Sequence, residues 1–167
     1  LLMIGFAFKA GFVPLSSWLP IAHPVAPAHV SGIMSAMMIK TGLYGILMLV
    51  LSNVFSLTEI AIFALISVIS AFWGVIHAMS SSHIKRALAY SSIENIGVIG
   101  IGISLGLLGA YSGNTQLATL AFAGAFLHIL FHSFFKALLF YLSGNVLLGA
   151  KSLEMDKLGA LAKRMPS

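Results

Sequence analysis

Three titratable residues recur at four-residue steps in the otherwise apolar stretch HILFHSFFKALLF, residues 128–140: His128, His132 and Lys136. On an α-helix, positions i, i+4 and i+8 fall on nearly one face, so the three side chains form a ladder about 12 Å long. Each imidazole can accept and donate a proton near neutral pH, and the ammonium group biases the protonation of both. The spacing therefore predicts a proton relay, in a helix that we expect to be irregular near Ser133. The alternative is that Lys136 only anchors an anion.

Lys40 and Glu94 are two further charged residues inside apolar segments. A charge near the middle of a membrane costs about 3 kcal/mol or more unless it faces a partner or a water-filled cavity. A buried carboxyl group beside a lysine can pass between charged and neutral forms, because burial and pairing act on it in opposite directions. We therefore predict that both residues are functional. The alternatives are a lysine that reaches the membrane surface and a static ion pair.

Lys9 lies five residues before Pro14, where a helix is expected to be interrupted. Interrupted helices at membrane depth are tolerated where they line polar cavities. These residues together predict a segment of a proton or cation pathway. A lone histidine near a span end, His77, is predicted to be structural, and Ser31 and Ser35 are predicted to serve helix packing or hydration.

Metal binding and catalysis are not predicted. Histidines at i and i+4 can chelate zinc, but Lys136 would repel the cation, and no carboxylate or cysteine stands nearby in the sequence. The chain has no cysteine, so it can hold neither a disulfide nor a cysteine-ligated cluster. It also has no nucleotide-binding glycine motif and no paired carboxylates. We predict no cofactor, and a non-catalytic, ion-translocating subunit of an oxidoreductase complex whose redox chemistry sits on other polypeptides.

The composition indicates an all-α, polytopic transmembrane helix bundle, because 59% of the 167 residues are hydrophobic and only 8% are charged. Nine Lys and Arg outnumber four Asp and Glu, but they form no stripe interleaved with aromatics, so nucleic acid is not predicted. The chain begins inside an apolar segment, so we expect a single transmembrane domain, 1–167, that is a fragment of a longer subunit. The expected spans are 1–14 in part, 28–51, 60–79, 87–108 and 117–148.

Basic residues orient the expected spans. One group lies between the second and third full spans, and another follows the last span, so an even number of crossings separates them. The positive-inside rule then places both groups in the cytoplasm, together with the proline-rich stretch LSSWLPIAHPVAPAH, which we expect to be a connection. The two groups are His83, Lys85 and Arg86, and Lys151, Lys157, Lys163 and Arg164.

Three long motifs resemble one known family: KAGFVPLSSWLPIAHPVAPAHVSGIMSAMMIKTGLYGI, IKRALAYSSIENIG and HILFHSFFKALLFYLSGNVL. The family is that of the antiporter-like proton-translocating subunits of respiratory complex I, multisubunit sodium/proton antiporters and membrane-bound hydrogenases. The motifs look most like the hydrogenase-4 branch of this family, the formate hydrogenlyase type. Glu94 and Asn95 favour this branch over complex I, where the position more often carries His or Gln.

The resemblance implies a partial antiporter-like fold with discontinuous helices, in the inner membrane of a bacterium or archaeon. It also implies a buried axis that conducts protons, or sodium exchanged for them, beside other membrane and peripheral subunits. Lys9 matches the lysine of the first broken helix, whose partner glutamate would lie upstream. Two departures, Ser16 in place of a usual His and His83 in place of a usual Asp, indicate a differently built entry region. The implied pathway residues are Lys9, Lys40, Lys85, Glu94, His128, His132 and Lys136.

Overall fold

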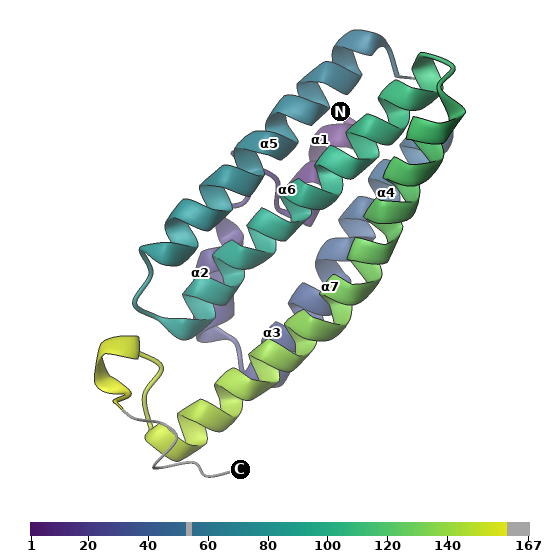
Figure 1. Ribbon diagram of the computed structural model, residues 1–167. Helices are drawn as coiled ribbons and strands as arrows, with labels where there is room; N and C mark the ends of the chain where they lie inside the picture. The colour runs from purple at the N-terminus through teal and green to yellow at the C-terminus, as the bar shows by residue number, and fades with distance from the viewer. Residues whose placement is uncertain (53–54, 160–167) are drawn as a thin grey trace.

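The computed structural model describes residues 1–52 and 55–159, and in these ranges the chain is built from helices and contains no strand. The long helices run side by side as an elongated bundle (Figure 1). The fold is therefore all-α, as the composition predicts. In chain order the elements are α1 (Leu2–Ala10), α2 (Trp18–Val25), α3 (Ala28–Ile33), the π-helical η1 (Met34–Met38), α4 (Ile39–Leu51), α5 (Leu57–Met79), α6 (Ile84–Tyr111), α7 (Thr115–Ala150) and the 3-10 turn η2 (Met155–Lys157).

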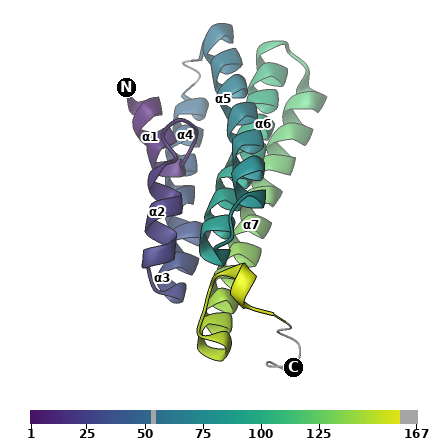
Figure 2. The same cartoon turned by 90° about the vertical axis from the view of Figure 1, so that its left-hand side faces the viewer.

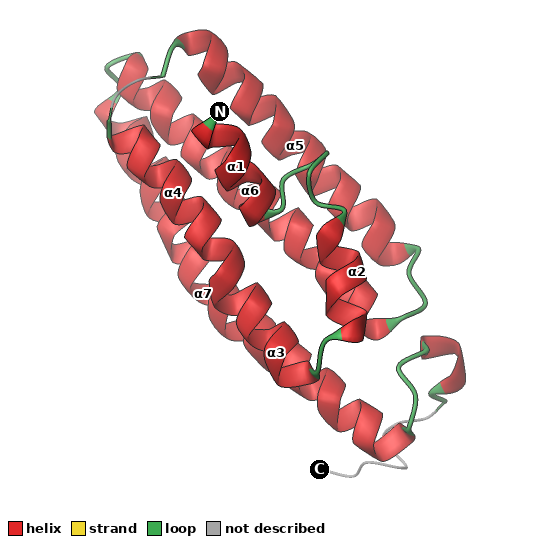
Figure 3. Ribbon diagram, turned by 180° about the vertical axis from the view of Figure 1, so that it is seen from behind, coloured by secondary structure: helices red, strands yellow, loops and turns green. Residues whose placement is uncertain are grey.

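Within the described ranges, four helices are long and apolar enough to cross a membrane. They are the continuous run Ala28–Leu51, which contains α3, η1 and α4, followed by α5, α6 and α7. The short helices α1 and α2 lie one after the other along this bundle, joined by a non-helical turn (Figure 3). The predicted transmembrane bundle with discontinuous helices is confirmed. The single-domain, fragmentary organisation stays a prediction.

Hydrogen bonds satisfy the helix ends at the break between α1 and α2. Gly11 adopts the left-handed conformation, with φ 88°, and the Phe12 N–H donates to the carbonyl oxygen of Ala7. The indole N–H of Trp18 donates to the Phe8 carbonyl at 3.0 Å. The Val13 N–H donates to Ser70 Oγ on α5 at 2.9 Å. The interruption that Pro14 predicts is therefore held in place by the neighbouring helix.

Two local expectations are wrong. Part of the proline-rich stretch forms the helix α2, although Pro24 lies inside it. Pro20 lies in the first turn, where a backbone N–H has no helical partner to lose. The helix α7 continues through Ser133, whose hydroxyl donates to the Ile129 carbonyl at 2.8 Å. A serine that bonds four residues back keeps its hydroxyl satisfied inside a regular helix. The irregular turn lies instead in η1.

Glycines bring α5 and α6 into close contact. A Cβ atom on Gly97 would lie 2.7 Å from the Ser67 carbonyl oxygen and would also meet the backbone nitrogen of Ala71. Gly74, on α5, is close to the backbone of Glu94 in the same way. Because these neighbours are backbone atoms, neither helix can yield by changing a rotamer. Glycine is therefore required for this spacing.

Replacing Gly97 by alanine is expected to destabilise the full-length protein by about 1 to 3 kcal/mol, the usual cost of overpacking. The matched control is Gly124→Ala on α7, because nothing lies within 4 Å of a Cβ at Gly124. This control should be neutral or stabilising by up to about 1 kcal/mol. Thermal unfolding in detergent measures both. Equal melting temperatures for the two variants would contradict the close α5–α6 contact.

The two basic segments lie at one end of the bundle. His83, before α6, pairs with Glu154, after α7, in an antiparallel bridge. The Ile84 N–H donates to the Leu153 carbonyl at 3.0 Å, and the Met155 N–H donates to the Ser82 carbonyl at 2.8 Å. Figures 1 and 2 show the two segments side by side. The predicted common end is thus observed for the described part, while Lys163 and Arg164 lie outside the described residues. The cytoplasmic orientation stays a prediction.

Candidate functional site

Lys40 and His132 meet between α4 and α7. Lys40 Nζ lies 2.6 Å from His132 Nδ1. The same Nζ donates to the carbonyl oxygen of Ser35 at 2.5 Å. Ser35 belongs to η1, and such π-helical turns frequently mark functional sites. The irregular turn therefore supplies a backbone acceptor for a lysine in the middle of a span.

The contact between Lys40 and His132 can hold only one proton between its two nitrogens. If the lysine is an ammonium ion, Nδ1 of the imidazole must accept the hydrogen bond. If the lysine is neutral, its nitrogen can accept from Nδ1–H instead. His132 is 0% exposed, so water does not surround the ring. A proton can therefore pass between two side chains that lie 92 positions apart in the sequence.

Lys136 is buried one turn further along α7 and is 0% exposed. Its ammonium group donates to the carbonyl oxygen of Leu88 on α6 at 3.1 Å. Ser92 Oγ donates to the same carbonyl at 3.0 Å and lies 2.8 Å from Ser35 Oγ. These hydroxyls connect the surroundings of Lys136 with the η1 turn, where the Ser35 carbonyl accepts a hydrogen bond from Lys40. We call Lys40, His132, Lys136, Ser35, Ser92, His128 and Asn95 the polar cluster.

His128 extends the polar cluster toward Asn95 of α6. His128 Nε2 lies 2.9 Å from Asn95 Oδ1, and the Asn95 amide nitrogen donates to the Ser91 carbonyl at 2.7 Å. The amide oxygen can only accept, so Nε2 of His128 carries a hydrogen. The ring centroids of His128 and His132 are 6.2 Å apart. A proton crossing this gap needs a bridging water, which can replace a direct hydrogen bond at little cost.

The ladder residues share one face of α7, as the spacing predicts. His132 and Lys136 are buried and His128 is half-buried, whereas Phe126, Phe131 and Phe134 point outward and are more than half exposed. A groove of about 470 Å³ between α4 and α7 opens beside Lys40. The cluster is therefore enclosed at His132 and Lys136 and open to the surroundings at Lys40.

Three other predicted residues lie outside these hydrogen bonds. Glu94 is half-buried on α6 and interacts electrostatically with Lys136 and His128. Lys85 is buried in the first turn of α6, and its Nζ donates to the Ala26 carbonyl at 2.7 Å. Lys9 is exposed in the last turn of α1. The structure thus brings Lys40 and the ladder together and leaves Lys9 and Lys85 apart.

Sequence reasoning did not assign four side chains to this site, although it named Ser35 for helix packing or hydration. Asn95, rather than Glu94, bonds to the ladder, and Ser35 and Ser92 link α3–α4 with α6. His23 on α2 is fully buried. A polar residue next to Glu94 in an apolar span is a signal that pointed to Asn95. The serines carry no such signal, because small residues at helical spacing also serve packing.

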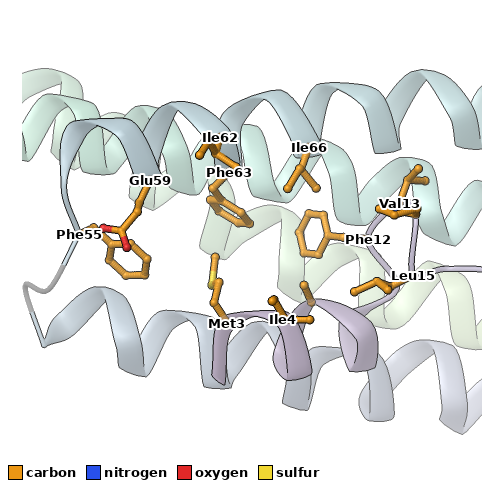
Figure 4. Close-up of a pocket in the computed structure, with 12 residues that line it drawn as sticks. Met3, Ile4, Phe12, Val13, Leu15, Phe55, Glu59, Ile62, Phe63 and Ile66 are labelled. Atoms are coloured by element: carbon orange, nitrogen blue, oxygen red, sulfur yellow. The ribbon is translucent and has the colours of Figure 1, made fainter. Parts of the chain in front are cut away.

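An apolar cavity of about 330 Å³ lies between α1 and α5, away from the polar cluster. Figure 4 shows Met3, Phe12 and Phe63 among the side chains that point into it, with Glu59 at one end. Glu59 caps α5, because its carboxylate accepts from the Ser56 N–H at 2.8 Å. Among the described residues, no group of three or more His, Cys, Asp or Glu side chains is placed to hold a metal ion.

Membrane-length helices with hydrogen-bonded lysine and histidine side chains in their interior are the features of an integral membrane protein with a buried polar site. The chain belongs to the family described as NADH:quinone oxidoreductase/Mrp antiporter, transmembrane, whose model matches residues 1–167. The predicted family is confirmed.

Similar proteins include two from Escherichia coli strain K12. Hydrogenase-4 component B is 40% identical over 171 residues, an alignment that covers 99% of this chain and 25% of that protein. Formate hydrogenlyase subunit 3 is 38% identical over 166 residues, covering 98% of this chain and 27% of that protein. The chain therefore spans about a quarter of the length of these relatives.

A solved structure shares the fold. It is a chain of the membrane-bound sulfane sulfur reductase, an archaeal respiratory membrane complex. The TM-score is 0.81 at 24% identity, and the match covers 98% of this chain and 32% of that one. The antiporter-like arrangement of the helices is thus found in an experimentally determined membrane complex.

Proposed function

We propose that this chain is part of an ion-translocating subunit of a membrane-bound hydrogenase or a related respiratory complex. Protons, or sodium ions exchanged for them, move along the buried axis through intervening water. The centre of this axis consists of Lys40, His132, Lys136 and His128. Glu94 acts on the centre electrostatically, and the ends of the axis lie toward Lys9 and Lys85. The redox chemistry that drives this movement takes place on partner subunits in the inner membrane of a bacterium or archaeon. The alternatives are a complex I subunit, a multisubunit cation/proton antiporter and a non-conducting anchor.

The hydrogen bond between Lys40 and His132 carries the proposal. It joins two groups on different spanning helices that can each hold a proton, at a distance of 2.6 Å. Proton transfer requires donor and acceptor within hydrogen-bond reach, directly or through one water. The ring centroids of His132 and His128 are 6.2 Å apart, which leaves the next step to water. Direct contact alternating with such a gap is the arrangement that a relay needs.

The surroundings of Lys136 argue against a purely structural anchor. Moving a charge from water into the protein interior costs free energy, so a structural anchor should pair each buried charge with an opposite one. Lys136 donates instead to a backbone carbonyl, that of Leu88. Lys40 likewise bonds to a carbonyl and to an imidazole. These partners can stabilise a lysine in its charged form and still allow it to lose a proton.

Proton flux in the full-length protein, assembled in its complex and reconstituted in liposomes, tests the proposal. An imposed pH difference should drive flux that a pH-sensitive dye inside the vesicles reports. Adding sodium distinguishes proton movement from exchange, because exchange should make the flux depend on a sodium gradient. Absence of flux above that of protein-free liposomes would favour the anchor.

Replacing Glu94 by glutamine is expected to slow proton flux severalfold without preventing assembly. The amide keeps the shape and hydrogen-bonding capacity of the side chain but removes the charge near Lys136 and His128. Glu59→Gln is the matched control, because Glu59 is exposed and serves to cap α5. If both variants conduct like the wild type, Glu94 does not influence the axis.

A further inference from the structure

His23, on α2, is the buried titratable side chain that the proposed axis leaves unused. It is 0% exposed, and neither Nδ1 nor Nε2 has a hydrogen-bond partner among the described protein atoms. An imidazole always carries at least one N–H donor, and its other nitrogen either accepts or donates. Leaving both nitrogens unpaired in an apolar site is costly. Because the ring is enclosed, only a partner as small as water can reach it without rearrangement.

One face of His23 lies against the part of α7 that carries Lys136. The imidazole stacks on the ring of Phe140, with centroids 4.5 Å apart and planes inclined by 15°. Phe140 follows Lys136 by four residues, so the two side chains lie on the same face of the helix. Lys136 and Lys85 are the cations that act electrostatically on the ring. His23 therefore neighbours the buried end of the ladder.

The backbone around His23 leads to the basic end of the bundle. Ser31 Oγ donates to the His23 carbonyl at 3.0 Å. Three residues after His23, the Ala26 carbonyl accepts from Lys85 Nζ at 2.7 Å. Lys85 stands in the first turn of α6, next to the exposed Arg86 and to the bridge between His83 and Glu154. His23 thus lies between Lys136 and the surface formed by the basic segments.

We infer that His23 is a further proton-carrying residue, which connects Lys136 through water to the basic end of the bundle. The inference rests on the proposed function and gives the axis an exit that the ladder by itself lacks. A proton leaving the Lys136 ammonium group passes to a water between the two residues, and that water gives a proton to one ring nitrogen. The other ring nitrogen then releases its proton toward the end of α2, where Ser31 and Lys85 lie, through a further water. No bond other than those to hydrogen is made or broken.

The test compares His23→Phe with the wild type in the full-length complex in liposomes. Phenylalanine keeps the ring and its stacking on Phe140 but cannot bind water or a proton. We expect a fall in proton flux of about a hundredfold, within the range that a positioned proton-transferring group contributes. His77→Phe is the matched control, because His77 is also a stacked imidazole, with its ring centroid 4.1 Å from that of Trp73. This control should conduct normally.

The outcomes separate the inference from the proposed function. Normal flux in assembled His23→Phe, while Lys136→Met blocks flux, overturns the inference alone. Normal flux in Lys136→Met as well overturns the proposed axis. If His23→Phe does not assemble, His23→Gln decides, because glutamine can bind water but cannot carry the proton.

A second measurement does not depend on flux. Nitrogen-15 spectra of the histidine-labelled protein in membranes should contain ring signals that disappear in His23→Phe. These signals should show magnetisation exchange with water protons. If these signals show no exchange with water protons, His23 only packs against Phe140, and the inference is wrong.

Discussion

Replacing Lys40 by methionine is expected to reduce proton flux through the full-length complex about a thousandfold while leaving assembly nearly intact. Methionine keeps most of the apolar stem of the lysine but removes the nitrogen that meets His132 and Ser35. The loss of a buried cation leaves no anion without a partner at this point, because both of its hydrogen-bond partners are neutral groups. The dye-based flux assay in liposomes measures the first effect, and the yield of intact complex measures the second.

The matched control for Lys40 is Lys157→Met. Lys157 is exposed in η2, so this change also removes one positive charge but none from the bundle interior. It should leave the flux unchanged. Wild-type flux in an assembled Lys40→Met complex would make Lys40 a packing residue and would remove it from the axis.

Replacing His132 by asparagine is expected to have an effect of similar size, a reduction of about a thousandfold in flux. The asparagine oxygen can accept a hydrogen bond from Lys40 as Nδ1 does, so the lysine keeps a partner. The amide cannot take up a proton at neutral pH, and the relay is interrupted between Lys40 and His128. A change to alanine would also leave a cavity at a fully buried position and confound the result.

The corresponding control is His77→Asn on α5. His77 Nδ1 lies 2.9 Å from the Trp73 carbonyl oxygen, a bond that an asparagine amide nitrogen can replace. Its ring stacks near Trp73 and Tyr90, outside the polar cluster. If His77→Asn lowers the flux more than His132→Asn does, the relay through the ladder is wrong.

Patterns within single segments were sufficient for the helical fold and for the ladder. The four-residue spacing of His128, His132 and Lys136 fixes their common face, because helix geometry relates nearby positions rigidly. The apolar composition predicts that the chain lies in a membrane, and Pro14 indicates the interruption after α1. The π-helical turn at η1 could not be predicted, since no local residue type demands it. It arises where Lys40 and Ser35 meet α6 and α7.

The choice of partners depended on how the helices pack. Glu94 and Asn95 are adjacent in the sequence and equally exceptional in an apolar span, yet only Asn95 faces His128 within hydrogen-bond distance. Successive residues on a helix point about 100° apart, so a small rotation of α6 determines which of them meets α7.

Residue types and their spacing are enough to predict a membrane-spanning helical protein with a row of protonatable groups on one helix. Hydrophobicity and helical periodicity are local properties, and they suffice for that conclusion. Three contacts became visible only in the folded chain: Lys40 bonds to His132, Lys85 bonds to the end of α2, and His23 is enclosed beside Phe140. These contacts join residues far apart in the chain. Their distances depend on the packing of whole helices, which no single segment encodes.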